Sequence, residues 1–228
     1  MTRFDDIVSL VPPDVKSVAD VGYDHGRVIL LLSKTHDHIR IIGVEQQPEA
    51  RGRFWRLHGA DESLRSRVEL LHGNGLEPLE SKGPDVVVIG GLGERSIVEI
   101  LARSEGILPG IGRLVLAPMD TKGVLRRYLH SISWSVVEER LSRKRSRFYQ
   151  VYAAEPGMRS IDASTWLFGT DLFDQNHPLL LEFLTDLKRR YRPMVEHYKD
   201  DRDRIPSFYR SINRAIAVAG DMKAKSSP

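Results

Sequence analysis

The sequence has no cysteine among its 228 residues. Disulfide bonds, thiolate nucleophiles and cysteine-ligated metals are therefore excluded. No apolar run approaches the roughly 18 residues that a membrane-spanning helix needs, and residues 1–6 lack the basic and then apolar layout of a secretory signal. We therefore expect a cytoplasmic protein with no membrane partner.

Metal-ligand patterns are also missing. None of the eight histidines has the H-x₃-H spacing beside acidic residues that marks a metal site, and the pair His36 and His38 around Asp37 is typical of a surface turn. We expect no metal. No pattern determines the oligomeric state, for which a monomer is the default expectation.

The composition, 41% hydrophobic and 29% charged, is that of an ordinary globular protein, and the length allows one well-buried core and a small second unit. The net charge of +3 weakly favours a polyanionic partner such as RNA. Five cations lie within eight residues that hold no acid: Arg140, Arg143, Lys144, Arg145 and Arg147. This segment is either a solvated hairpin turn or a patch that contacts phosphates.

Short apolar segments alternate with segments of helical spacing along the first 131 residues. A helix is expected over 3–11, strands over 18–21, 39–44, 67–71, 85–89 and 113–116, and further helices over 25–35, 48–59, 97–104 and 121–131. Two more strands, 135–141 and 148–154, have only a short connection and should form an antiparallel hairpin. The sequence therefore predicts an α/β fold, the Rossmann-like seven-stranded sheet of class I methyltransferases.

The pattern changes after Gly157. Residues 158–176 are expected to be irregular, and helical spacing begins at Pro178, with Pro193 interrupting or kinking the helix. Pro206 should open a second helix, so that the tail forms a helical hairpin. The predicted domains are 1–157, which would bind the cofactor, and 158–228, which would be helical.

The first strand leads into a loop with two acids, and residues 17–27 read S-V-A-D-V-G-Y-D-H-G-R. Gly22 allows a tight turn, with Asp20 before it and Asp24 after it. A dinucleotide-binding loop would need glycine where Asp24 stands, and a carboxylate there repels a pyrophosphate. A cationic ligand without phosphate suits the two acids better, and S-adenosyl-L-methionine is such a ligand.

The ends of three further strands offer matching groups. Glu45 would accept hydrogen bonds from ribose hydroxyls, Asn74 would pair with an adenine edge, and the glycines at 90–93 would let the main chain lie against the methionine part. An acid at a strand end, such as Glu45, could instead be a solvated loop residue. The predicted cofactor-binding residues are Asp20, Gly22, Tyr23, His25, Glu45, Gln46, Asn74, Gly75, Gly90, Gly91 and Leu92.

These residues resemble a known family, the bacterial tRNA adenine-N1 methyltransferases that modify adenine 22. The family's first motif, V-A-D-I-G-S-D-H-A, is similar to V-A-D-V-G-Y-D-H-G at 18–26, and its Asp-His pair is uncommon among methyltransferases at large. Further similar positions are Arg3, 73–76, 89–93, Arg126, Tyr149 and 166–169. The resemblance covers nearly the whole chain.

The resemblance implies a tRNA methyltransferase that acts at N1 of adenine, with a helical tail that helps to hold tRNA. It also implies that Asp24 is the catalytic residue. A carboxylate there would stabilise the positive charge of the methylated base or take a proton from N6, with His25 as the alternative polar group. The predicted substrate residues are Arg3, Pro118, Asp120, Arg126, Arg143, Lys144, Arg145 and Arg147.

The chain departs from the family on the acceptor side. Residues 117–119 are Ala-Pro-Met where the family has Gln-Pro-Asn, so two side chains that would hold a flipped-out base are missing, and Asp120 would have to substitute. Glu94 adds a charge near the pocket, and Tyr23 replaces a serine. Two alternatives follow: a homologue that binds cofactor or RNA without catalysis, and a methyltransferase for another acceptor.

Overall fold

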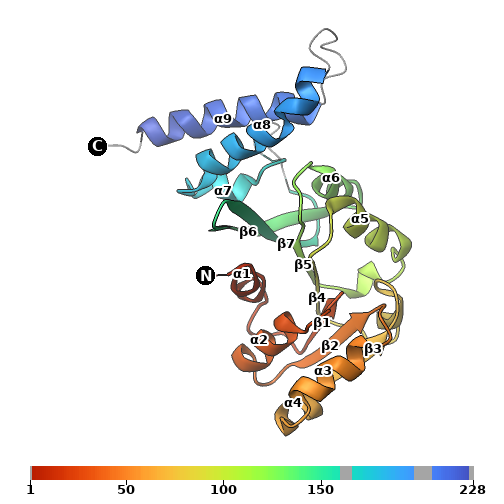
Figure 1. Cartoon of the computed structure of the whole chain (residues 1–228). Helices are drawn as coiled ribbons and strands as arrows, with labels where there is room; N and C mark the ends of the chain where they lie inside the picture. The colour runs from red at the N-terminus through yellow and green to blue at the C-terminus, as the bar shows by residue number, and fades with distance from the viewer. Residues whose placement is uncertain (1, 160–165, 198–206, 226–228) are drawn as a thin grey trace.

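The computed structural model describes residues 2–159, 166–197 and 207–225, and forms a seven-stranded sheet with a helical unit beyond one edge (Figure 1). The strand order is β3-β2-β1-β4-β5-β7-β6. The strands are β1 Ser17–Val21, β2 Arg40–Glu45, β3 Val68–His72, β4 Val86–Gly90, β5 Arg113–Ala117, β6 Trp134–Lys144 and β7 Arg147–Pro156. The first five are parallel, β7 runs antiparallel to β5, and β6 to β7. The predicted Rossmann-like methyltransferase sheet is confirmed.

Helices cover both faces of this sheet (Figure 1). They are α1 Arg3–Ser9, α2 Arg27–Thr35, α3 Ala50–His58, α4 Glu62–Arg67, α5 Glu94–Arg103 and α6 Val124–Ser131, with short 3₁₀ turns at Glu77–Leu79 and Leu108–Gly110. The first four pack with one core cluster, through Ile7, Ile29 and Phe54. Helices α5 and α6 pack with a second cluster on the other face, through Ile97 and Leu125. The central strands are buried on both sides, as their continuous apolar sequences indicate.

The sheet order reverses between β1 and β4, which are hydrogen-bonded neighbours. Helices that follow β1 lie on the opposite face from those that follow β4. A crevice therefore opens beyond the carboxyl ends of these two strands, the place where open α/β sheets bind ligands. Its walls are the loops after Val21 and Gly90, and the first motif of the sequence lies in one of them.

The β6–β7 hairpin joins the sheet to the C-terminal helices. Its strands pair from Trp134 with Pro156 to Lys144 with Arg147, so the hairpin is longer than predicted. Leu141 on β6 packs in a third core cluster with residues of α7 Thr170–Asp174, α8 Leu180–His197 and α9 Ser207–Lys225. This apolar cluster attaches the helical unit to the hairpin.

Several expectations about the tail need correction. Residues 170–174 form α7 instead of irregular chain. Helix α8 continues through Pro193, so the proline does not interrupt it. A proline costs a helix one backbone hydrogen bond, and the packing of α8 against α9 outweighs that cost. The two helices lie side by side (Figure 1). Pro206 and residues 160–165 lie outside the described residues.

The starts of three helices also differ from the prediction. Helix α4 was not predicted, and it begins where the Asp61 carboxylate accepts hydrogen bonds from the backbone of Ser63 and Leu64. Helix α3 begins at Ala50, after Pro48, and α6 begins at Val124 instead of residue 121. No helix in the described part of the chain is both long and apolar enough to cross a membrane.

Candidate functional site

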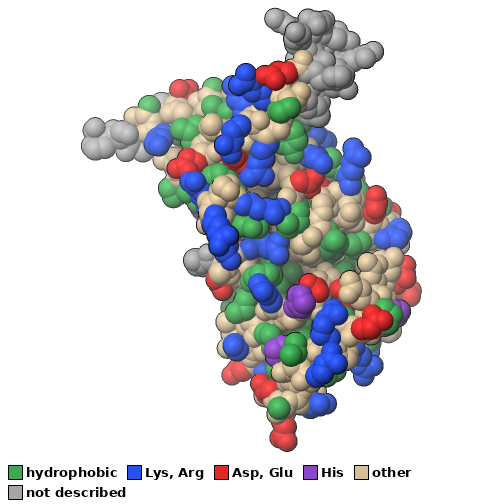
Figure 2. Space-filling model, viewed as in Figure 1, with side chains coloured by type: hydrophobic (Ala, Val, Ile, Leu, Met, Phe, Trp, Pro, Cys, Tyr) green, Lys and Arg blue, Asp and Glu red, His purple; other side chains and the backbone are tan. Residues whose placement is uncertain are grey.

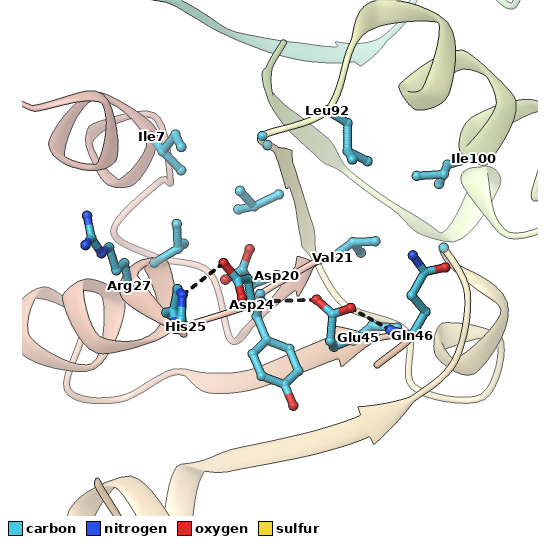
Figure 3. Close-up of a pocket in the computed structure, with 18 of the residues that line it drawn as sticks. Ile7, Asp20, Val21, Asp24, His25, Arg27, Glu45, Gln46, Leu92 and Ile100 are labelled. Atoms are coloured by element: carbon cyan, nitrogen blue, oxygen red, sulfur yellow. Dashed lines mark hydrogen bonds and ion pairs between the residues drawn. The ribbon is translucent and has the colours of Figure 1, made fainter. Parts of the chain in front are cut away.

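A cavity of about 480 Å³ lies at the carboxyl ends of the strands, between α1 and the loops after β1, β2, β3 and β4. All eleven predicted cofactor-binding residues line it, together with Asp24 and Arg3. Figure 3 shows Asp20, Asp24 and Glu45 around one space, with Leu92 and Ile100 on the side opposite to them. Four loops that are distant in sequence thus form one pocket, as the sequence indicated.

The loop after β1 holds a backbone conformation that most residues avoid. Gly22 has φ 78°, Asp24 has φ 45° and Gly26 has φ 69°. A Cβ on Gly26 would overlap the ring of Phe54, so only glycine fits there. Asp24 is held in this left-handed conformation by its own N–H, which donates to Glu45 Oε2 at 3.1 Å. Such strain at a non-glycine residue is typical of functional loops.

Asp20 is a buried carboxylate at the base of the pocket, with only 4% of its surface exposed. Among the described residues, none donates a hydrogen bond to it. Burial, and then the negative charge of Glu45, raise the pKa of Asp20 to about 7. A cationic ligand in the pocket would restore the ionised form, and this is the physical fit between the site and a sulfonium donor that also carries an ammonium group.

Glu45 ends β2 and organises the loops around it. Its Oε2 accepts from Asp24, and its Oε1 accepts from the backbone N–H groups of Gln46 at 2.9 Å and Gln47 at 3.1 Å. A carboxylate has roughly four acceptor positions, so about one remains for a ligand hydroxyl. The prediction that Glu45 binds ribose stays a prediction, and the geometry favours one ribose hydroxyl over two.

The Asp24 side chain lies at the mouth of the pocket and is 61% exposed. His25 Nε2 lies 3.5 Å from its Oδ2, and Arg53 of α3 lies 3.6 Å from its Oδ1 (Figure 3 shows the first of these). The carboxylate is thus oriented by two cationic or polar neighbours while one side stays open to the cavity. A group so placed is suited to stabilise positive charge on a bound base.

Tyr23 is one of the predicted cofactor-binding residues, at a position where the resembling family has serine. Its ring is buried and packs edge to face against Phe54 at 6.3 Å between centroids, so it offers a ligand no stacking surface. Burial, followed by the nearby Glu45 charge, raises the pKa of the Tyr23 hydroxyl to about 12. The residue therefore supports the loop from the core side.

Backbone forms part of the opposite wall, beside the Leu92 and Ile100 side chains. Gly91 has φ 81°, and nothing lies within 4 Å of the position that a Cβ would take, so a ligand can lie directly against it. Asn74 is exposed on the loop after β3 and lines the cavity. The loop after β4 is tied to the loop after β5, since Met119 N–H donates to the Leu92 carbonyl at 2.8 Å.

The acceptor-side predictions fare less well. Pro118 is buried, and neither it nor Asp120 lines the cavity. Asp120 accepts hydrogen bonds from Glu94 N–H at 2.8 Å and pairs with Lys122 at 2.7 Å. Although burial raises its pKa, these donors outweigh burial and lower the pKa of Asp120 below its ordinary value. The carboxylate is committed to fixing the loop, so it does not replace the missing base-holding amides.

Arg126 was predicted to contact RNA, and its placement contradicts this. The side chain is 4% exposed and forms two hydrogen bonds with Glu139, at 2.9 and 3.0 Å, above the ring of Tyr152. Gln150 donates to the same carboxylate. Arg126 therefore locks α6 to the hairpin instead of meeting a partner.

The basic segment divides into paired and unpaired cations. Arg140 pairs with Glu138, and Arg143 pairs with Glu182 of α8 at 2.6 Å. Lys144 and Arg145 are exposed at the turn, with no ion pair to any described residue. Figure 2 shows Lys and Arg side chains along the face that runs from α8 across the hairpin. That this segment contacts phosphate stays a prediction. The residues best placed for such a contact are those without an ion pair, such as Lys144 and Arg145.

The lining residues that the sequence reasoning missed include the polar or aromatic Phe4, Arg27 and Gln47 and the apolar Ile100. It also missed Arg53, which reaches Asp24 from α3. The only signal in the sequence was helical spacing, and spacing does not tell which face of a helix meets the loop of another element. Among the described residues no cluster of three or more potential metal ligands occurs.

Comparison with known proteins gives a consistent result. A family model described as a methyltransferase domain matches residues 1–152. The tRNA (adenine(22)-N(1))-methyltransferase of Bacillus subtilis is 27% identical over 149 residues, which cover 64% of this chain and 61% of that relative. The matched region thus spans about three fifths of that curated relative.

Solved structures match over almost the whole chain. TrmK of M. capricolum, in complex with S-adenosyl-homocysteine, superposes with a TM-score of 0.80 at 16% identity, covering 96% of this chain and 97% of that one. The B. subtilis m1A22 tRNA methyltransferase gives 0.77 at 20% identity, with coverage of 96% and 97%. These identities show a shared fold, which includes the helical tail.

The similarity to tRNA adenine-N1 methyltransferases that the first motif indicated is thereby confirmed. The family model, the strand order and the pocket at the switch point agree on one assignment. The chain belongs to the methyltransferase-domain family.

Proposed function

We propose that this protein is an S-adenosyl-L-methionine-dependent tRNA methyltransferase that acts at N1 of adenine, at adenine 22 by relation to its B. subtilis relative. The observation that carries the proposal is the buried Asp20 carboxylate, which no described residue satisfies, beneath a strained loop that presents Asp24. A tRNA substrate places the activity in the cytoplasm.

The residues present fit this cofactor. Asp20 would neutralise its cationic end, Glu45 would accept a ribose hydroxyl, and the open backbone at Gly91 would lie against its methionine part. The cofactor would supply the methyl group as a sulfonium donor. The apolar side chains Leu92 and Ile100 would exclude water from the adenine.

The chain's own contribution to chemistry centres on Asp24. The nucleophile would be the neutral N1 lone pair of adenine, and methylation leaves a positive charge on the ring. The Asp24 carboxylate, held by His25 and Arg53, would stabilise that charge or accept the proton released from N6. Preorganisation of the carboxylate by the left-handed loop avoids reorientation when the charge develops.

A second candidate is a methyltransferase for another acceptor. The observation in its favour is the loop after β5, where Asp120 is occupied and residues 117 and 119 offer no amide to a base edge. In that case the same cofactor half would serve a different nucleophile.

Labelled S-adenosyl-L-methionine and unmodified bulk tRNA test both candidates. After incubation, the tRNA is digested and the labelled nucleoside is identified. Label in 1-methyladenosine, lost from a transcript that carries guanosine at position 22, supports the proposal. Label in another nucleoside supports the second candidate. Cofactor binding without any transfer to tRNA contradicts the proposal and restricts the second candidate to acceptors other than tRNA.

A further inference from the structure

Two arginines from opposite ends of the sheet domain meet beside the cavity. Arg3 of α1 points its Nη1 at the sulfur of Met119, 3.0 Å away, and Arg147 of β7 approaches the same sulfur at 3.9 Å. Arg147 also donates to the Met119 carbonyl at 3.4 Å. Both guanidinium groups stack on the ring of Tyr149, with centroid distances of 5.6 and 5.5 Å. One sulfur and one ring therefore bring two positive charges together.

No carboxylate among the described residues pairs with either guanidinium, in contrast to Arg140 and Arg143 on the same hairpin. Arg27 adds a third charge nearby, over the same Phe4 ring that Arg3 covers. Burial, and the charges of Arg147 and Arg27, lower the pKa of Arg3, with Tyr149 opposing them. Like charges held together without an acid repel each other, so this arrangement suits an anionic partner.

The position of Arg3 at the cavity indicates which kind of anion the two arginines would bind. Arg3 lines the same cavity as Asp24, so an anion on this pair would sit at the mouth through which a substrate base must enter. A base taken out of its stack carries its flanking phosphates with it. Guanidinium groups bind such phosphates with paired hydrogen bonds, and the aromatic ring beneath them limits their freedom.

We propose that Arg3 and Arg147 together bind one phosphate of the RNA backbone, adjoining the nucleoside whose base enters the cavity. The inference rests on the proposed function, since it assumes an RNA acceptor. The Met119 thioether contacts both guanidinium groups without neutralising their charge. The resembling family carries asparagine at this position.

The test is tRNA binding as a function of salt, for Arg3→Gln, Arg147→Gln and the double variant. One neutralised phosphate contributes about 0.7 to 0.9 to the slope of log affinity against log salt. Because the two arginines share a phosphate, we expect each single variant to keep most of that contribution and the double variant to lose it once. We expect the double variant to bind on the order of tenfold more weakly.

A double variant that loses about twice this slope would show two separate phosphate contacts and overturn the inference. An unchanged slope and affinity would overturn it as well. Arg103→Gln, which removes one positive charge from the exposed face of α5, is the control for net charge. Should Arg3→Gln fail to fold, Arg147→Glu replaces it, because this exposed change places a carboxylate beside Arg3 and should cost more affinity than Arg147→Gln.

The readouts separate this inference from the proposed function. If the wild-type protein methylates tRNA and the double variant matches it in salt slope, only the phosphate assignment is wrong. If the wild-type protein neither binds nor methylates tRNA, the proposed function is wrong and the phosphate assignment falls with it. Binding of S-adenosyl-homocysteine, measured by calorimetry, should be equal in all variants.

Discussion

The two sides of the cavity carry opposite charge. The cofactor side presents Asp20 and Glu45, with Asp24 at the mouth of the cavity. The acceptor side presents Arg3 and Arg27, and Arg147 lies next to Arg3 at the Met119 sulfur. In the proposed function, the acids would attract the cationic methyl donor and the arginines would attract the polyanionic acceptor. This separation teaches that one pocket can bind two ligands of opposite charge, provided that each lies against its own wall.

The two sides also differ in how they are held. Asp20 and Glu45 lie on the central strands β1 and β2, and the loops that follow these strands are fixed by backbone hydrogen bonds to the Glu45 carboxylate. The arginines are held by stacking on Phe4 and Tyr149, by the Met119 thioether and, for Arg147, by one long hydrogen bond to the Met119 carbonyl. The cofactor wall is therefore the more rigid one, and substitutions on it should have the larger effects.

The largest expected effect comes from the acid that lies between the two walls. Asp24→Asn keeps the shape and tolerates a positive φ, but removes the charge opposite the methylated base. We expect methyl transfer to fall by about 10²- to 10⁴-fold, with cofactor binding and thermal stability retained. Single-turnover transfer assays and calorimetry measure the two properties. Asp37→Asn, on an exposed turn, is the matched control, and wild-type turnover of the Asp24 variant would remove it from the mechanism.

A pH test sharpens the role of Asp20. Its folded-state pKa of about 7 lies above the ordinary value of 3.8, so the folded protein holds a proton that the unfolded chain releases. Stability should therefore fall as the pH rises from about 4 to 7, and Asp20→Asn should recover up to about 4 kcal/mol at pH 8. Urea unfolding at pH 5 and pH 8 measures this difference.

The pH dependence of cofactor affinity should run opposite to that of stability, and Asp20→Asn tests this as well. Cofactor affinity should increase between pH 6 and 8 in the wild-type protein, as Asp20 ionises, and should lose this part of its pH dependence in Asp20→Asn. Equal pH profiles for the two proteins would mean that Asp20 does not face the cationic group.

A substitution at Arg126 tests whether the RNA-binding surface includes the side of the hairpin that packs against α6. Arg126→Met leaves the buried Glu139 carboxylate without its partner, so we expect a loss of about 3 kcal/mol in the free energy of unfolding. The salt dependence of tRNA binding should not change. Arg126→Met combined with Glu139→Leu should recover much of the stability, whereas a reduced salt slope in the single variant would return Arg126 to the RNA surface.

The smallest effect is expected at the hairpin turn. Neutralising Lys144 and Arg145 together, as Lys144→Gln and Arg145→Gln, should lower the salt slope of tRNA binding by about 1 and leave cofactor binding unchanged. Neutralising Arg140, which already pairs with Glu138, is the control and should alter the slope less. Equal effects of the two changes would contradict the distinction between paired and unpaired cations.

Local sequence was a sufficient guide for the sheet and for the cofactor wall. The β-branched strand at residues 86–89 and the alternation of strands with helices required only near neighbours along the chain. The acids and glycines of the pocket follow strand ends, and parallel strands bring those ends to one edge. Position in the sequence therefore determined position in the fold.

Contacts between distant segments had to be seen in the tertiary structure. The start of α5 depends on the Asp120 carboxylate, 26 residues away, and that of α6 on hydrogen bonds from Lys122 and Val124 to Glu94. The same applies to side chains that the sequence assigned wrongly. Tyr23 and Arg126 carry polar groups typical of sites, but packing against Phe54 and Glu139 buries them.

The sequence by itself determined the α/β class, the order of the units and the loop that carries the two acids. Only the tertiary structure decided which arginines are neutralised and which remain available, as with Arg143 against Glu182 and Arg3 beside Arg147. The physical reason is that backbone patterns depend on neighbours in the chain, whereas the charge of a surface depends on neighbours in space.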